Sequence, residues 1–132
     1  MGTASSLTMI EQWLCRFRLD AFLHMHACGV LSAMPGEVVL DLVGDPAFAL
    51  CDYEPGPRVV AHIPVAPPGA NRPSRSVVLK RTLRHRPVAF VRWVIAHELA
   101  HAHLRNSGRW PGEDPEHAAD ALAAEWGFTR PG

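Results

Sequence analysis

The sequence predicts a single domain of the α+β class, with an N-terminal helix, a small and mostly antiparallel sheet, and two helices near the C-terminus. Three observations lead to this prediction. Apolar residues recur every three or four positions near the N-terminus, short β-branched runs fill the middle, and helical patterns return near the end. A chain of 132 residues is long enough for one hydrophobic core and too short for two, so residues 1–132 are expected to form one domain.

Each expected element of the first half has its own local signal. Residues 7–32 are predicted as one helix, because Ile10, Trp13 and Leu14 begin an apolar pattern with spacings of three and four. Either Gly29 or the turn at residues 34–36 is expected to end this helix. About four strands follow, separated by segments rich in proline and glycine, at Val38–Val43, Phe48–Cys51, Arg58–Ile63 and Val77–Leu79.

Two helices are expected after the strands. The first begins near Pro87, runs through an almost wholly apolar stretch and ends at residues 106–108, and we expect it to pack on the sheet. The second begins at Asp114, a favourable N-cap, with Pro115 in the first helical position and Gly127 as the stop. Its alanine-rich body favours a helix and lets it approach the first one closely.

The first of these helices carries the pattern H-E-x-x-H, from His97 to His101. Because a helix turns by about 100° per residue, the two histidines project from one face, one turn apart. Two imidazoles at that spacing can bind one zinc ion, and Glu98 beside them is a candidate general base. The residues before the motif are apolar, and ionisable groups in such surroundings are costly unless something neutralises them. A metal ion would do so.

A third ligand is expected from the second helix, where Glu116 and Asp120 lie four residues apart and so share one face. We assign Glu116 to the metal. Asp120 is then placed to accept a hydrogen bond from a ligand histidine, which would fix the tautomer of that ring. Two alternatives stay open for the third ligand, namely His117 and direct ligation by Asp120.

These two motifs resemble those of the zincin metallopeptidases of the gluzincin type. With its continuation through Phe128, the pattern E-x-x-A-D from Glu116 to Asp120 is similar to that of the small ImmA/IrrE-type peptidases of bacteria and phages. The resemblance covers roughly residues 76–128. It implies a Zn²⁺ cofactor with Glu116 as the third ligand. It also implies a strand at the rim of the substrate cleft just before the zinc-binding helix, a place that Ser76–Lys80 fits.

The expected function is therefore that of a zinc-dependent endopeptidase acting on a specific protein or peptide substrate, such as a regulatory protein. Glu98 would take a proton from a water molecule that the zinc ion activates. Tyr53 or Arg109 is a candidate to stabilise the oxyanion.

Two other functions remain open at this stage. The segment from Arg72 to Arg92 contains seven lysines and arginines and no acidic residue, which suits a DNA-associated protease similar to the SprT-like enzymes. A catalytically inactive zinc-binding interaction module is the other alternative. The presence of Glu98 argues against that module, because a structural zinc site needs no base.

Composition bounds the partners and the compartment. The 13 basic and 13 acidic residues balance, so net charge gives no reason to expect a nucleic-acid or membrane partner. No apolar run approaches the roughly 18–20 residues that span a bilayer, and the first residues do not form a secretion signal. Three scattered cysteines suggest free thiols, and hence a cytoplasmic protein.

Overall fold

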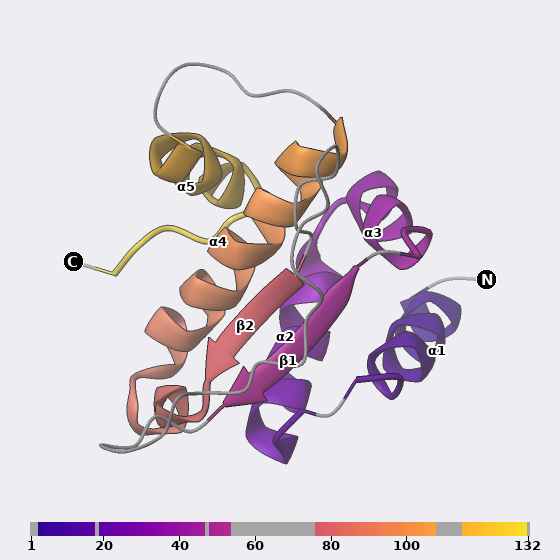
Figure 1. Ribbon diagram of the computed structural model, residues 1–132, viewed down its shortest axis with the longest axis horizontal. Coiled ribbons are helices and arrows are strands. Elements are labelled where there is room, and N and C mark those ends of the chain that lie inside the picture. Colours follow the sequence, from indigo (N-terminus) through magenta and orange to yellow (C-terminus); the bar gives the residue numbers. More distant parts are fainter. Residues whose placement is uncertain (1–2, 18, 47, 54–75, 108–114, 132) are drawn as a thin grey trace.

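A computed structural model describes residues 3–17, 19–46, 48–53, 76–107 and 115–131 (Figure 1). This part of the chain is mostly helical and contains one small sheet. Its elements are α1 (Thr3–Leu14), α2 (Ala21–Ala33), α3 (Gly36–Val43), β1 (Ala49–Tyr53), β2 (Ser76–Lys80), the 3-10 helix η1 (Arg81–His85), α4 (Val88–Ser107) and α5 (Pro115–Glu125). The prediction of a mixed helix-and-strand fold is confirmed. None of the helices described is long and apolar enough to cross a membrane.

The sheet differs from the one expected. In the described part of the chain it has two strands, β1 and β2, which pair in parallel from Ala49 opposite Ser76 to Tyr53 opposite Lys80. The predicted antiparallel direction is wrong for this pair. A parallel pair needs a crossover of a dozen or more residues, and residues 54–75 are long enough to supply one. The predicted strand Arg58–Ile63 falls within that segment, outside the residues described.

The predicted strand Val38–Val43 is instead the helix α3. A strand would alternate its buried positions, whereas here Val38, Val39 and Leu42 are buried together and Leu40 is 62% exposed. Positions 38, 39 and 42 lie on one face of a helix, so this burial pattern is that of a helix. Tertiary burial of that face outweighs the preference of valine for strands, a preference that depends strongly on context.

The predicted single helix over residues 7–32 is two helices, α1 and α2. Asp20 is the N-cap at which α2 begins, because its carboxylate accepts a hydrogen bond of 3.0 Å from the backbone N–H of Phe22. The backbone N–H of Asp20 in turn donates to the carboxylate of Asp52 in β1. An aspartate just before an apolar segment is the sequence signal that the periodicity analysis missed.

The helix α4 contacts α2, α3, α5 and β2, and so lies at the centre of the described fold. Its limits agree with the predicted helix, and it packs beside the sheet as expected (Figure 1). Val91, Ile95 and Leu99 recur every four residues and are almost completely buried. Because this face fills the core, the neighbouring faces of α4 are held in fixed directions.

The helix α5 lies against α4 on the side away from the sheet (Figure 1). The helix ends at Glu125, and Gly127, two residues later, has a φ of 98° that only glycine adopts readily. The N–H groups of Gly127 and Phe128 donate to the carbonyls of Ala124 and Ala123, at 3.0 and 2.9 Å, which is the Schellman arrangement. The predicted stop is therefore confirmed, whereas the predicted cap Asp114 lies outside the described residues.

Candidate metal centre

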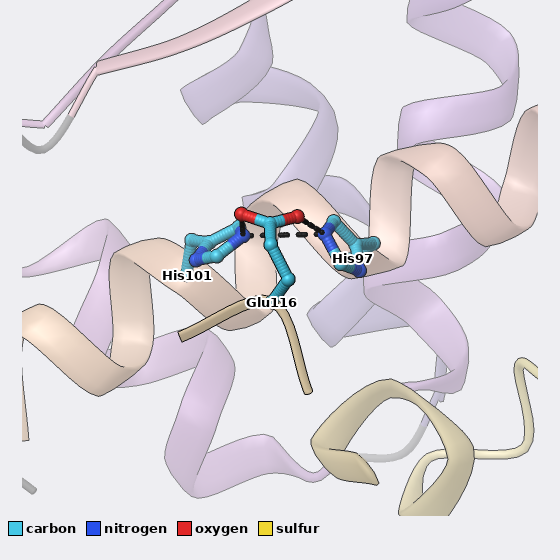
Figure 2. Close-up of side chains that lie close together, drawn as sticks. All are labelled: His97, His101 and Glu116. Atoms are coloured by element: carbon cyan, nitrogen blue, oxygen red, sulfur yellow. Dashed lines mark hydrogen bonds and ion pairs between the residues drawn. The ribbon is translucent and has the colours of Figure 1, made fainter. Parts of the chain in front are cut away.

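The two histidines of the motif project from the same side of α4, one helical turn apart (Figure 2). Each is only 7% exposed. Their ring centroids are 4.7 Å apart and their Nε2 atoms 3.2 Å apart. The helix therefore delivers two buried imidazole nitrogens to nearly the same point, as the spacing of His97 and His101 predicts.

Glu116 reaches this point from the first turn of α5. Its Oε1 atom lies 2.9 Å from Nε2 of His97, and its Oε2 atom lies 3.0 Å from Nε2 of His101 (Figure 2). The three residues offer ligand atoms that all lie within 4.8 Å of one another, and no other group of this kind occurs among the residues described. The Glu116 side chain is 69% exposed, so the cluster opens to solvent on its side.

Asp120 fixes the proton on His97. Its Oδ1 atom lies 2.8 Å from Nδ1 of His97. An ionised carboxylate only accepts, so Nδ1 carries the hydrogen, and in the neutral ring Nε2 then presents a lone pair. That lone pair faces Oε1 of Glu116, which is another acceptor. A proton or a cation between them is needed to make this contact favourable.

The distances suit zinc. A tetrahedral zinc ion holds nitrogen and oxygen ligands at about 2.0–2.2 Å, which places neighbouring ligand atoms about 3.3 Å apart. The Nε2 atoms of the two histidines lie 3.2 Å apart, close to this spacing, and a different oxygen of Glu116 approaches each of them, at 2.9 and 3.0 Å. Two histidines and one carboxylate also form a common ligand set of catalytic zinc sites. The residues present therefore fit this metal.

The electrostatics of the cluster favour the proton state that a metal requires. Burial lowers the pKa of His101, while the carboxylates of Glu116 and Glu98 raise it in part. The close contact with the His97 imidazole lowers the pKa of Glu116, and partial burial of the carboxyl group raises it only in part. A neutral imidazole beside an ionised carboxylate is the form in which both groups bind a divalent ion.

Glu98 lies on the next face of α4 and lines a groove. Phe90, Val94 and Glu98 follow one another at intervals of four residues along this groove, which has a volume of about 560 Å³. Its other wall is formed by β2, with Val78–Lys80, and by η1. Ser76–Lys80 is thus the strand beside the groove. Of the motif from His97 to His101, Glu98 is the residue that lines the groove, and His97 directly precedes it in α4.

The remaining predicted residues are placed as follows. His117 is exposed and does not belong to the cluster. Asp120 contacts Nδ1 of His97, whereas the cluster is formed around Nε2 of that ring. The geometry therefore favours Glu116 over both alternatives. Tyr53 ends β1 opposite Lys80, and only its backbone is described. Arg109 lies outside the described residues, so the oxyanion role of either residue stays a prediction.

Two neighbours of the cluster were not anticipated. The ring of Trp93 lies 5.3 Å from the ring of His97, and the guanidinium of Arg130 lies 5.2 Å from the centre of Trp93. Trp93 precedes His97 by one helical turn, so the spacing of four could have identified it. Arg130 follows α5 and carried no comparable signal. Trp93 therefore packs beside the His97 ring, and Arg130 in turn lies over Trp93.

Comparisons of the chain with known protein families, with curated proteins and with solved structures find no match.

Proposed function

We propose that this protein is a zinc-dependent endopeptidase in which His97, His101 and Glu116 hold the metal and Glu98 is the general base. The convergence of these three ligand atoms is the observation that carries the proposal. Two further features support it. Asp120 contacts the opposite nitrogen of His97, and Glu98, which directly follows His97, lines a groove. The resemblance to the ImmA/IrrE-type peptidases agrees with the same residues.

The chemistry divides among the residues as follows. A zinc ion held by His97, His101 and Glu116 would supply an activated water molecule and would polarise the peptide carbonyl group. Glu98 would accept a proton from the attacking water. It then returns the proton to the leaving amine. Asp120 keeps Nδ1 of His97 protonated and so keeps Nε2 available as a ligand.

The groove provides the place for a substrate. It runs between β2 and α4, and Val78, Leu83 and Val94 give it apolar walls. An extended peptide can bind beside a strand through main-chain hydrogen bonds, with alternate side chains entering pockets. A peptide lying along β2 would pass Glu98, which is the position that hydrolysis requires.

The first test separates metal binding from catalysis. The Glu98→Gln variant removes the base without removing a ligand, so it should still bind one zinc ion per chain. Its cleavage of a peptide library should fall by roughly 10²- to 10⁴-fold, the range that general bases contribute. Metal content by mass spectrometry and cleavage rates would be measured on the same samples. Undiminished cleavage by this variant would refute the role of Glu98.

The second test concerns the third ligand. Glu116→Ala should weaken zinc binding strongly, because it removes one of three ligands. Glu125→Ala is the matched control, since Glu125 is an exposed carboxylate near the other end of the same helix and outside the cluster. Equal zinc affinity in the two variants would exclude Glu116 as a ligand.

A further inference from the structure

The segment from Lys80 to Arg86 concentrates positive charge beside the groove. It contains five basic residues within seven positions. Two of them turn to the body of the protein, where Arg81 donates to Asp52 at 3.0 Å and Arg84 lies 3.8 Å from Asp20. These two residues do not line the groove. Their charges are at least partly balanced by carboxylates of the fold.

The other three basic residues, Lys80, His85 and Arg86, are exposed and line the groove. No ion pair to any of them occurs within the described part of the chain. The guanidinium of Arg86 lies 4.0 Å from the centre of the Phe90 ring, which holds this charge over the groove wall. Among the residues described, Glu98 is the only acidic one in the lining. The groove therefore has a basic end and, at the proposed catalytic end, a single carboxylate.

Apolar side chains lie between these two ends. Leu83 is buried below the surface, and Phe90 and Val94 are half-buried along α4. A groove of about 560 Å³ falls in the usual range of ligand sites and can accept large apolar side chains. The groove therefore favours a ligand with an apolar side chain at this position, because binding removes the apolar side chain and the apolar groove wall from water.

The length of α4 sets the distance between the ends. Eight residues separate Phe90 from Glu98, which corresponds to about 12 Å along a helix. An extended peptide covers about 3.3 Å per residue, so this distance matches about four residues. If the cleaved bond lies at Glu98, the peptide residue whose side chain binds near Arg86 and Phe90 is therefore about four positions away from that bond.

We infer that the groove selects peptides that carry an aspartate or glutamate about four residues from the cleaved bond, with a large apolar residue between the two. This inference rests on the proposed peptidase function, because it places the scissile bond at Glu98. The acidic side chain pairs with Lys80 and Arg86, and the apolar one packs between Leu83 and Val94. The substrate class is therefore an acidic, partly apolar peptide segment.

A nucleic acid is the other anionic occupant to consider, and the lining suits it less well. Proteins that hold single strands stack bases on exposed aromatic rings. Phe90 is the only Phe, Tyr or Trp side chain that lines the groove among the residues described, and the guanidinium of Arg86 already covers its ring. A phosphate backbone also has no large apolar group that could pack against the apolar side chains between the two charged ends of the groove.

Cleavage specificity gives the first test. The zinc-loaded protein would be given paired peptides that differ only in Glu or Gln at the fourth position from the cleaved bond. We expect kcat/KM to be about five- to tenfold higher for the Glu peptide, mainly through KM, and the preference to shrink at high salt. The double variant Lys80→Gln/Arg86→Gln should lose this preference. Arg84→Gln, in the same segment but outside the groove, should keep it.

Binding without cleavage gives the second test and separates the two proposals. Labelled Glu and Gln peptides and a single-stranded oligonucleotide would be titrated against the zinc-loaded Glu98→Gln protein. Tighter binding of the Glu peptide, lost in the Lys80→Gln/Arg86→Gln background, supports the inference even if no peptide is ever cleaved. Absence of cleavage by the wild type contradicts only the peptidase function. Equal or absent binding of both peptides, or preferential binding of the oligonucleotide, would overturn the inference.

Discussion

His97 uses both of its ring nitrogens in the site, and each nitrogen faces a different carboxylate. Nδ1 contacts Asp120 and Nε2 contacts Glu116, at 2.8 and 2.9 Å. Both carboxylates come from the same face of α5, four residues apart. The helix that carries the proposed third ligand thus also contacts the other nitrogen of the proposed first ligand, so a single element influences both the tautomer of His97 and the geometry of the cluster.

A prediction about Asp120 follows from this arrangement. Asp120→Ala should lower zinc affinity by about 10- to 100-fold, because His97 loses the acceptor that orients its ring. His117→Ala, which changes an exposed neighbour on the same helix, should have a much smaller effect. Competition with a chromophoric chelator measures both affinities. If the two variants bind zinc equally well, Asp120 does not orient the ligand.

The site was predictable at the scale of residues because helical spacing converts directly into direction. Once α4 and α5 are helices, residues 97 and 101 share one face, and residues 116 and 120 share another. The spacing within one helix does not state how two helices meet, however. Arg130 shows this limit, since its contact with Trp93 depends on where the chain turns after Gly127.

At the scale of elements, the contact between α4 and α5 determines whether the cluster forms. Ala119 and Ala123 of α5 are completely buried and lie on the same side of the helix as Glu116. Ala96 and Ala100 of α4 are equally buried. Small side chains let two helix backbones approach closely, and this approach brings the Glu116 carboxylate within reach of two imidazoles from another helix.

Enlarging one of these alanines should therefore separate the helices. Ala123→Leu is expected to cost about 1–3 kcal/mol of unfolding free energy through overpacking, and to weaken zinc binding as well. Ala121→Leu places the same side chain at an exposed position of α5 and should change stability by no more than about 0.5 kcal/mol. Chemical denaturation and zinc titration would check both effects. Normal zinc affinity in Ala123→Leu would contradict this account.

The elements that sequence patterns predicted well are those with several independent local signals. The helix α4 has a long apolar period, and α5 has a proline start, an alanine-rich body and a glycine stop. The six residues Val38–Val43 are too few to show a period, so their valines suggested a strand. The parallel direction of β1 and β2 depends on how the intervening chain crosses, which no local pattern encodes.

At the scale of the whole molecule, α4 is surrounded by other elements and carries polar groups into the core. One of them is Arg92, whose Nε donates to Nδ1 of His26 in α2 at 3.2 Å. His26 is buried, and its ring also contacts the ring of Phe22 in a T-shaped arrangement. Burial first, and the Arg92 charge second, lower the pKa of His26 below its usual value of 6.5. The fold therefore holds this histidine neutral.

Stability should consequently depend on pH through His26. The unfolded chain binds a proton there more readily than the folded one, so the contribution is complete above about pH 6.5 and is lost as pH falls toward the lower folded pKa. In a chelating buffer, the free energy of unfolding of the wild type should fall more steeply between pH 7 and 5 than that of His26→Gln. Comparing the two metal-free proteins cancels the titration of the cluster histidines. Parallel curves would show that His26 is not held neutral.

The three ligand atoms of the cluster are two nitrogens and one oxygen, and none of the three cysteines belongs to it. Cobalt(II) commonly replaces zinc in such sites, and thiolate ligands then add an intense near-ultraviolet charge-transfer band that nitrogen and oxygen ligands lack. The cobalt form of this protein should therefore show only weak visible bands. Cys15 is exposed and lies in the connection after α1, so a fluorescent label can be attached there without touching the chromophore. Colour and fluorescence can then follow metal occupancy and N-terminal structure separately in one sample.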